Sequence, residues 1–208
     1  MTLSRRAFIG ASAGMGLGAA LGTAALPPGL MPKADAATYK KTLTGVGKDP
    51  DRRWDVVGTD LGIPYVLENG SIGYLFGDTF SSALPGGPGW RSPVMLRSNV
   101  APGAPGGIVF DSAAGVAGDG YAPEIMYNGH NGDDGAGTFE VTVIPNDGIG
   151  FPETGDQIVS YMSIAQWYDG GPPRWRTNYA GIAHSTDGNT FVRTPYVWWN
   201  NGSNTDPY

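Results

Sequence analysis

The sequence predicts an all-β domain, and three observations lead to that prediction. First, 34 glycines and 17 prolines are spread through the chain without a period, which is typical of many turns between short strands. Second, no long helical period of apolar residues follows Ala37. Third, short apolar runs recur between clusters of Gly, Pro, Asn and Asp, as expected for strands.

We predict that residues 1–36 are a cleavable twin-arginine signal peptide and not part of the folded domain. Arg5-Arg6 precede an uncharged stretch rich in Ala, Gly and Leu, and Ala34-Asp35-Ala36 offers a small-x-small cleavage site. A membrane anchor is the alternative, but the stretch is weakly apolar and is interrupted by Pro27-Pro28. We therefore predict the twin-arginine export machinery as a partner, a secreted or cell-wall-associated location, and a mature domain of residues 37–208.

Composition limits the chemistry of this domain. The chain has no cysteine, so disulfides and thiolate ligands are excluded. A formal net charge of −6, with no basic run after the signal, argues against a nucleic-acid partner. His130 and His184 show no close ligand spacing, and Gly132-Asp133-Asp134-Gly135 lacks the spacing of a calcium loop. We predict neither a metal nor a cofactor.

The strand from Phe139 to Val143 shows the strictest alternation, which predicts that Phe139, Val141 and Val143 share one buried face. Further strands are predicted over residues 63–67, 71–76, 94–98, 158–164, 179–184 and 196–199. The turn clusters between them cover residues 84–89, 101–107 and 129–137, and loops of this length usually build or cover a site.

Residues 185–191, Ser-Thr-Asp-Gly-Asn-Thr-Phe, resemble the Asp-box turn of propeller blades. Asp187 is expected to bind turn amides, Gly188 to adopt a positive φ and Phe191 to pack beneath, which is a structural role. With blades of about 40 to 50 residues, the mature domain holds about three or four of them. The chain stops after a strand-like segment, so we expect a propeller truncated at its carboxy terminus.

Residues 54–80 predict one β-hairpin that carries two aspartates. If residues 68–70 form a three-residue loop with Gly70 in the left-handed region, Asp60 lies opposite Asp78. Like charges directly opposite each other destabilise a sheet, so this arrangement indicates a function.

A two-residue turn at Asn69-Gly70 is the alternative. It would send Asp60 and Asp78 to opposite faces unless a bulge at Gly62 or Gly77 intervened. Both aspartates could also be turn residues that bind nearby amides.

Five segments of the chain resemble an actinobacterial family that was catalogued as a domain of unknown function and includes endo-D-arabinanases. The segments are Gly58–Pro64, Phe76–Phe80, Ala122–Ile125, Ile144–Ile149 and Trp175–Tyr179. The resemblance implies a five-bladed β-propeller glycosidase with Asp60 and Asp78 as its catalytic pair. Two carboxylates suit glycoside hydrolysis, because it needs one protonated acid and one ionised carboxylate, and proximity separates their pKa values.

Six further residues are predicted to bind substrate. Glu124 is a third carboxylate for the cleft or a solvated strand end, and Arg176 is a sugar ligand or part of an ion pair between blades. Trp54 and Trp90 are stacking platforms for sugar rings or core residues. The complete set is Glu124, Arg176, Asn178, Tyr179, Trp54 and Trp90.

These inferences give two hypotheses of function. The first is an exported glycoside hydrolase that cleaves D-arabinan in mycobacterial or corynebacterial arabinogalactan or lipoarabinomannan, with this cell-wall polysaccharide as its partner. The alternative is a non-catalytic carbohydrate-binding propeller of the cell envelope.

Overall fold

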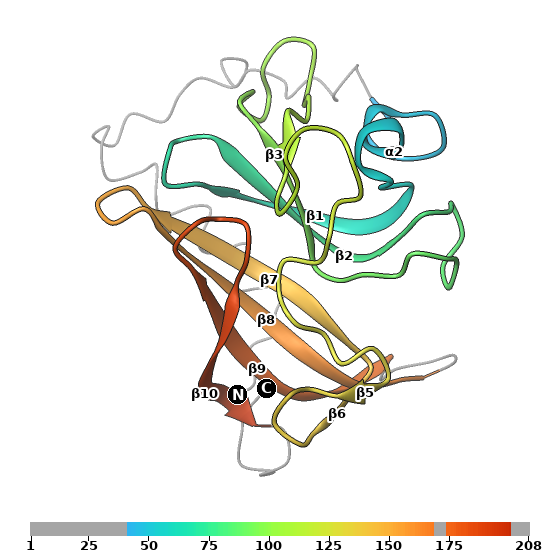
Figure 1. Cartoon of the computed structure of the whole chain (residues 1–208), viewed down its shortest axis with the longest axis vertical. Helices are drawn as coiled ribbons and strands as arrows, with labels where there is room; N and C mark the ends of the chain where they lie inside the picture. Colours follow the sequence, from blue (N-terminus) through green and yellow to red (C-terminus); the bar gives the residue numbers. More distant parts are fainter. Residues whose placement is uncertain (1–40, 169–173, 201–208) are drawn as a thin grey trace, which may run out of the picture. The chain divides into compact units, whose positions relative to one another are not determined.

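The computed structural model describes residues 41–168 and 174–200, all within the compact unit Lys41–Tyr208 (Figure 1). The predicted signal, residues 1–36, lies outside the described residues. Within the described ranges, the one helix is α2 (Asp49–Trp54), and no helix is long and apolar enough to cross a membrane.

The described secondary structure is nearly all β, which confirms the predicted class. The strands are β1 (Gly58–Val66), β2 (Ile72–Phe80), β3 (Val94–Ser98), β4 (Ser112–Ala113), β5 (Gly132–Asp133), β6 (Phe139–Glu140), β7 (Thr142–Phe151), β8 (Asp156–Trp167), β9 (Trp175–Ser185) and β10 (Val192–Asn200).

The strands form three antiparallel sheets. One four-stranded sheet has the order β1-β2-β3-β4, a second has the order β10-β9-β8-β7, and β5 pairs with β6 alone. Strands that are neighbours in sequence pair within each sheet. Short turns connect β1 to β2 and β7 to β8, whereas the longer loops 81–93 and 99–111 lie on either side of β3. None of these sheets closes on itself, so the structure shows separate open sheets and not a ring of five blades.

The core lies on both faces of the first sheet. A cluster that includes Leu75, Met95, Val143 and Val159 joins residues of the two four-stranded sheets. A second cluster, centred on the completely buried Trp54, packs α2 against β2 and β3. Strands β1 and β7 come close together, because Gly148 of β7 has no side chain to collide with the Tyr65 ring.

The predicted strand from Phe139 to Val143 is the clearest difference from the sequence-based expectation. The chain leaves β6 at Glu140 and enters β7 at Thr142, and the predicted buried face holds for Val143 but not for Phe139. Phe139 is 56% exposed, whereas Glu140 is completely buried. Glu140 can lie inside because Arg193 pairs with its carboxylate.

Strand β7 also continues through Pro145, which the sequence did not suggest as part of a strand. Proline is tolerated there because β7 is an edge strand, and the register shifts between Pro145 and Asp147.

The Asp-box prediction is confirmed. Asp187 Oδ1 accepts the backbone N–H groups of Asn189 and Thr190 at 2.8 and 3.0 Å, and these bonds lower the pKa of Asp187. Gly188 has a φ of 66°, and Phe191 is buried. The motif therefore has a structural role.

Candidate functional site

The β1–β2 hairpin turns through the predicted three-residue loop. Leu67 N–H donates to Ser71 O at 2.8 Å, Gly70 has a φ of 81°, and Val66 pairs with Ile72. This geometry excludes the two-residue turn.

Two shifts of strand register near the open end of the hairpin are in opposite directions, so the original register is restored. Leu61 pairs with Phe76, which shifts the register at Gly62, and the register returns where Thr59 pairs with Thr79. Asp60 is therefore in a bulge, next to Gly77 and Asp78. The structure brings the two aspartates together on one side of the hairpin, as the three-residue loop predicts.

Asp60 lies directly against the backbone of β2. A Cβ atom at Gly77 would collide with the Asp60 carboxylate, which accepts a hydrogen bond from the Gly77 backbone. Asp60 keeps an exposed face, but the surrounding protein removes part of its hydration. This partial burial, followed by the negative charge of Asp78, raises the pKa of Asp60 above its ordinary value.

Asp78 is half-buried and is held by two donors. Its Oδ1 accepts the Trp90 indole N–H at 2.8 Å and the Thr142 hydroxyl at 2.8 Å. Thr142 is completely buried, and its Oγ1 also accepts from Asn128 Nδ2 at 3.2 Å. These bonds fix the orientation of the Asp78 carboxylate.

Both aspartates line a cavity of about 620 Å³, which we call the carboxylate cavity. The hairpin supplies one wall, the loop with Pro85 and Trp90 a second, and Trp167 at the end of β8 a third. The volume is within the range of small-molecule sites.

Glu124 and His130 adjoin this cavity. Glu124 Oε2 lies 2.7 Å from His130 Nε2, and the His130 ring packs edge-on against Trp90 with the ring centroids 4.7 Å apart. Trp90 in turn donates to Asp78, so Glu124 is connected to the aspartate pair through two rings. The sequence offered no signal for His130, because only the folded loop brings it to Trp90.

Backbone strain is concentrated at the same place. Four non-glycine residues of the described ranges have a positive φ, and three of them flank the carboxylate cavity: Leu61 at 65°, His130 at 46° and Asn131 at 62°. Such conformations cost about 1–3 kcal/mol each and cluster at functional sites.

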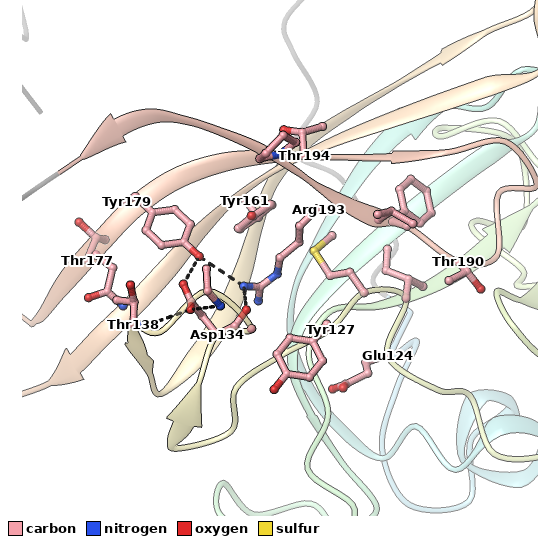
Figure 2. A pocket seen from close by; sticks show the side chains of 18 of the residues that line it. Glu124, Tyr127, Asp134, Thr138, Tyr161, Thr177, Tyr179, Thr190, Arg193 and Thr194 are labelled. Carbon is pink, nitrogen blue, oxygen red and sulfur yellow. Dashed lines mark hydrogen bonds between the residues drawn. The ribbon is translucent and has the colours of Figure 1, made fainter.

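A second cavity of about 940 Å³ lies beside β9 and β10, and we call it the tyrosine cavity because Tyr127, Tyr161 and Tyr179 line it (Figure 2). Glu124, Arg176, Asn178 and Tyr179, four of the predicted substrate ligands, line this cavity and not the carboxylate cavity. The predicted site is therefore divided between two places.

The polar groups of the tyrosine cavity bind mainly one another. The Tyr179 hydroxyl donates to Asp134 Oδ2 at 2.7 Å (Figure 2). Arg193 also makes bonds of 3.1 and 2.6 Å with the two oxygens of Glu140, which lies behind the cavity lining. Asn178 Nδ2 donates to Phe139 O at 2.8 Å and Ser163 Oγ at 3.0 Å. Asn178 and Tyr179 thus support the framework.

Charges in the tyrosine cavity are stabilised by these contacts. Burial alone would raise the pKa of Asp134, but bonds from Tyr179 and the Thr138 and Ala136 amides, with the charge of Arg193, lower it. Burial would lower the pKa of Arg193, but Glu140 raises it. Asp134 is part of an ordered turn, not a solvated one.

The two predicted tryptophan platforms have different positions. Trp54 is completely buried and donates its indole N–H to Gly118 O at 2.9 Å, so its ring is a core element and not a platform. Trp90 lines the carboxylate cavity, as does Trp167, which the sequence analysis did not single out. Among the described residues, no group of three or more His, Asp and Glu side chains could hold a metal ion.

Residues 46–207 match the family described as Domain of unknown function (DUF4185), and the chain belongs to this family. It is similar to Notoamide biosynthesis cluster protein J' of Aspergillus versicolor, with 56% identity over 173 residues, which cover 83% of this chain and 47% of that protein. It is equally similar to Notoamide biosynthesis cluster protein J of Aspergillus sp. (strain MF297-2), with 56% identity over 178 residues, 84% of this chain and 47% of the relative. The chain spans about half the length of these relatives.

The relatives correct the predicted function. Proteins named for notoamide biosynthesis in Aspergillus overturn the prediction of a glycosidase for cell-wall arabinan, and with it the alternative of a carbohydrate-binding propeller of the cell envelope. Arabinan and the twin-arginine machinery were wrong as partners for the same reason. Export of the chain and the domain boundary at residue 36 stay predictions.

Proposed function

We propose that the protein is an enzyme of secondary-metabolite biosynthesis that uses Asp60 and Asp78 as an acid–base pair. The biosynthetic setting is supported by the names of the two Aspergillus relatives. The observation that carries the chemistry is the position of both carboxylates in one small-molecule-sized cavity, held by a bulge and by two hydrogen-bond donors.

The surroundings of the two aspartates suit different roles. Burial and the neighbouring charge raise the pKa of Asp60, so Asp60 is the group that gives a proton to the substrate. Asp78, oriented by Trp90 and Thr142, is the carboxylate that takes a proton or stabilises a developing positive charge. The proposed reaction class is proton transfer to and from a small molecule, with no sugar specified.

The arrangement of the two four-stranded sheets suggests a propeller. Two four-stranded sheets in which neighbouring strands pair in sequence order, one of them with an Asp-box between its strands β9 and β10, are typical of propeller blades. We regard them as two blades of a propeller. A structure of a full-length relative in which the two sheets do not surround a common axis would contradict this assignment.

The test is a search for turnover in a metabolite mixture. We expect the purified chain, incubated with a small-molecule extract of an Aspergillus culture that makes notoamide, to deplete at least one compound and form another in mass spectrometry. Asp60→Asn and Asp78→Asn should each slow this conversion by about 10²- to 10⁴-fold, the contribution of a positioned acid or base.

Glu153→Gln is the matched control, because Glu153 is an exposed carboxylate in the turn between β7 and β8. Melting temperatures of all variants separate loss of chemistry from loss of fold. Unchanged conversion in both aspartate variants, or no conversion by the wild-type chain, would overturn the proposal.

A further inference from the structure

The carboxylate cavity combines negative charge with aromatic walls. Among the described residues that line it, Asp60 and Asp78 are the charged ones, and no Lys, Arg or His is present. The field inside the cavity is therefore negative, and it acts next to low-dielectric walls that strengthen it.

Two indole rings line the same cavity as this charge. The Trp90 ring is fixed by its bond to Asp78 Oδ1 and by its edge contact with His130. Trp167 is 43% exposed, and Trp175 packs edge-on against it with the ring centroids 6.0 Å apart. Phe80 adds a third aromatic side chain to the lining. Aromatic faces attract cations, most strongly where water is partly excluded.

The tyrosine cavity shows that this combination is specific to one place. There, Arg193 lies 5.1 Å from the Tyr161 ring centroid and 5.7 Å from that of Tyr127, so the protein supplies the cation itself. In the carboxylate cavity, rings and carboxylates come together without a protein cation among the described lining residues. A ligand has to supply it.

We infer that the carboxylate cavity binds an organic cation, an ammonium group carried on a ring system or apolar skeleton, with its charge between Asp60, Asp78 and the two indoles. As the identity of the substrate, the inference rests on the proposed function. As a binding preference, it stands on the cavity alone. A neutral molecule of the same shape would leave the negative charge of the aspartate pair without a counter-charge, and an anion would be repelled.

The test uses three small probes with the same phenyl ring and different charges: 2-phenylethylamine, which is a cation at neutral pH, neutral 2-phenylethanol, and anionic 3-phenylpropanoate. Dissociation constants are measured by NMR titration of the wild-type chain at low ionic strength. We expect the amine to bind at least about tenfold more tightly than the alcohol, and the carboxylate to bind most weakly.

Variants separate the two sources of the preference. Asp60→Asn with Asp78→Asn in one chain should reduce the amine-to-alcohol ratio to about two to five, the part that the rings contribute, and Trp167→Leu should weaken amine binding about two- to fivefold while alcohol binding changes less. Glu153→Gln is the control for charge. Phe139→Leu is the control for an exposed ring outside the lining of both cavities.

Equal binding of amine and alcohol, preference for the carboxylate, or binding of none of the probes would overturn the inference. Because the titration needs no turnover, its result is independent of the metabolite assay. A cation preference without conversion would refute the acid–base enzyme and leave the binding site. Conversion that depends on Asp60 and Asp78 without a cation preference would refute the ligand class and leave the enzyme.

Discussion

The two cavities place carboxylates in opposite surroundings. Behind the lining of the tyrosine cavity, the completely buried Glu140 pairs with Arg193, and in the cavity itself Asp134 accepts a hydrogen bond from the Tyr179 hydroxyl. In the carboxylate cavity, Asp60 lies close enough to Asp78 for partial burial and the Asp78 charge to raise the pKa of Asp60. A buried charge without a partner costs free energy, so the completely buried Glu140 needs Arg193. Asp60 keeps contact with water, and Asp78 has two neutral donors and, among the described residues, no cation. Glu140 and Asp134 therefore stabilise the fold, whereas Asp60 and Asp78 are available to bind or react with a ligand.

Backbone geometry follows the same division. The strained residues Leu61, His130 and Asn131 flank the carboxylate cavity, and the fourth, Asp55, caps the carboxyl end of α2. No non-glycine residue with a positive φ lines the tyrosine cavity within the described ranges. The site with unpaired carboxylates is therefore also the site where the fold stores strain.

The largest change in the free energy of unfolding is expected when Glu140, beside the tyrosine cavity, loses its charge. Glu140→Gln leaves the Arg193 guanidinium, whose side chain is only 12% exposed, without its counter-charge. Because a buried unpaired charge is strongly unfavourable, we expect the free energy of unfolding in urea to fall by about 3–5 kcal/mol. Replacing Glu140 and Arg193 together by Met should recover most of this loss.

Asp60→Asn is the matched variant from the carboxylate cavity. It removes a partly desolvated carboxylate beside a like charge, so the free energy of unfolding should stay the same or rise. If Glu140→Gln cost no more than Asp60→Asn, the distinction between structural and functional carboxylates would be wrong.

Local rules explain the parts of the site that the sequence predicts. The three-residue loop of residues 68–70 fixes the hairpin register, because Gly70 takes the left-handed position, and the register then brings Asp60 and Asp78 together. The Asp-box follows in the same way from contacts among neighbours.

Long-range contacts explain what could not be predicted. Alternation predicts that Phe139 is buried. Glu140 is buried instead, because it pairs with Arg193, which is 53 residues away in the chain. His130 and Trp167 reach the carboxylate cavity only through tertiary packing. The substrate could not be predicted for another reason. Relatives that share a fold and a site can act on different molecules, so a family resemblance predicts the fold and the site more reliably than the substrate.

Gly77→Ala should move the Asp60 carboxylate without removing it. In Gly77→Ala, the new Cβ collides with the end of the Asp60 side chain, which can swing away at little cost in stability. Because a displacement of about 1 Å can lower a rate by about 10²-fold, we expect a loss of that order in the metabolite conversion.

Glu153→Gln is again the control, because Glu153 is exposed in a turn outside both cavities. Conversion and melting temperature are measured for both variants. Full activity in Gly77→Ala would mean that the position of Asp60 against β2 is unimportant for the reaction.

The smallest expected effect concerns pH, and its sign should differ between the cavities. The raised pKa of Asp60 means that the folded state holds its proton more tightly than the unfolded state. Its contribution to stability is present below the ordinary value of 3.8 and is lost as the pH rises through the folded pKa. The lowered pKa of Asp134 has the opposite consequence, since its contribution is present above 3.8 and is lost as the pH falls through the folded pKa.

Urea unfolding of the wild type, Asp60→Asn and Asp134→Asn between about pH 3 and about pH 7 measures both contributions. The wild type should lose stability relative to Asp60→Asn as the pH rises, by less than about 1 kcal/mol because water screens the exposed face of Asp60. Relative to Asp134→Asn it should gain stability, since the hydrogen bonds of Asp134 favour the ionised form. Slopes of the same sign would show that the two carboxylates have the same kind of surroundings, and the assignment of Asp60 as the acid would lose its physical basis.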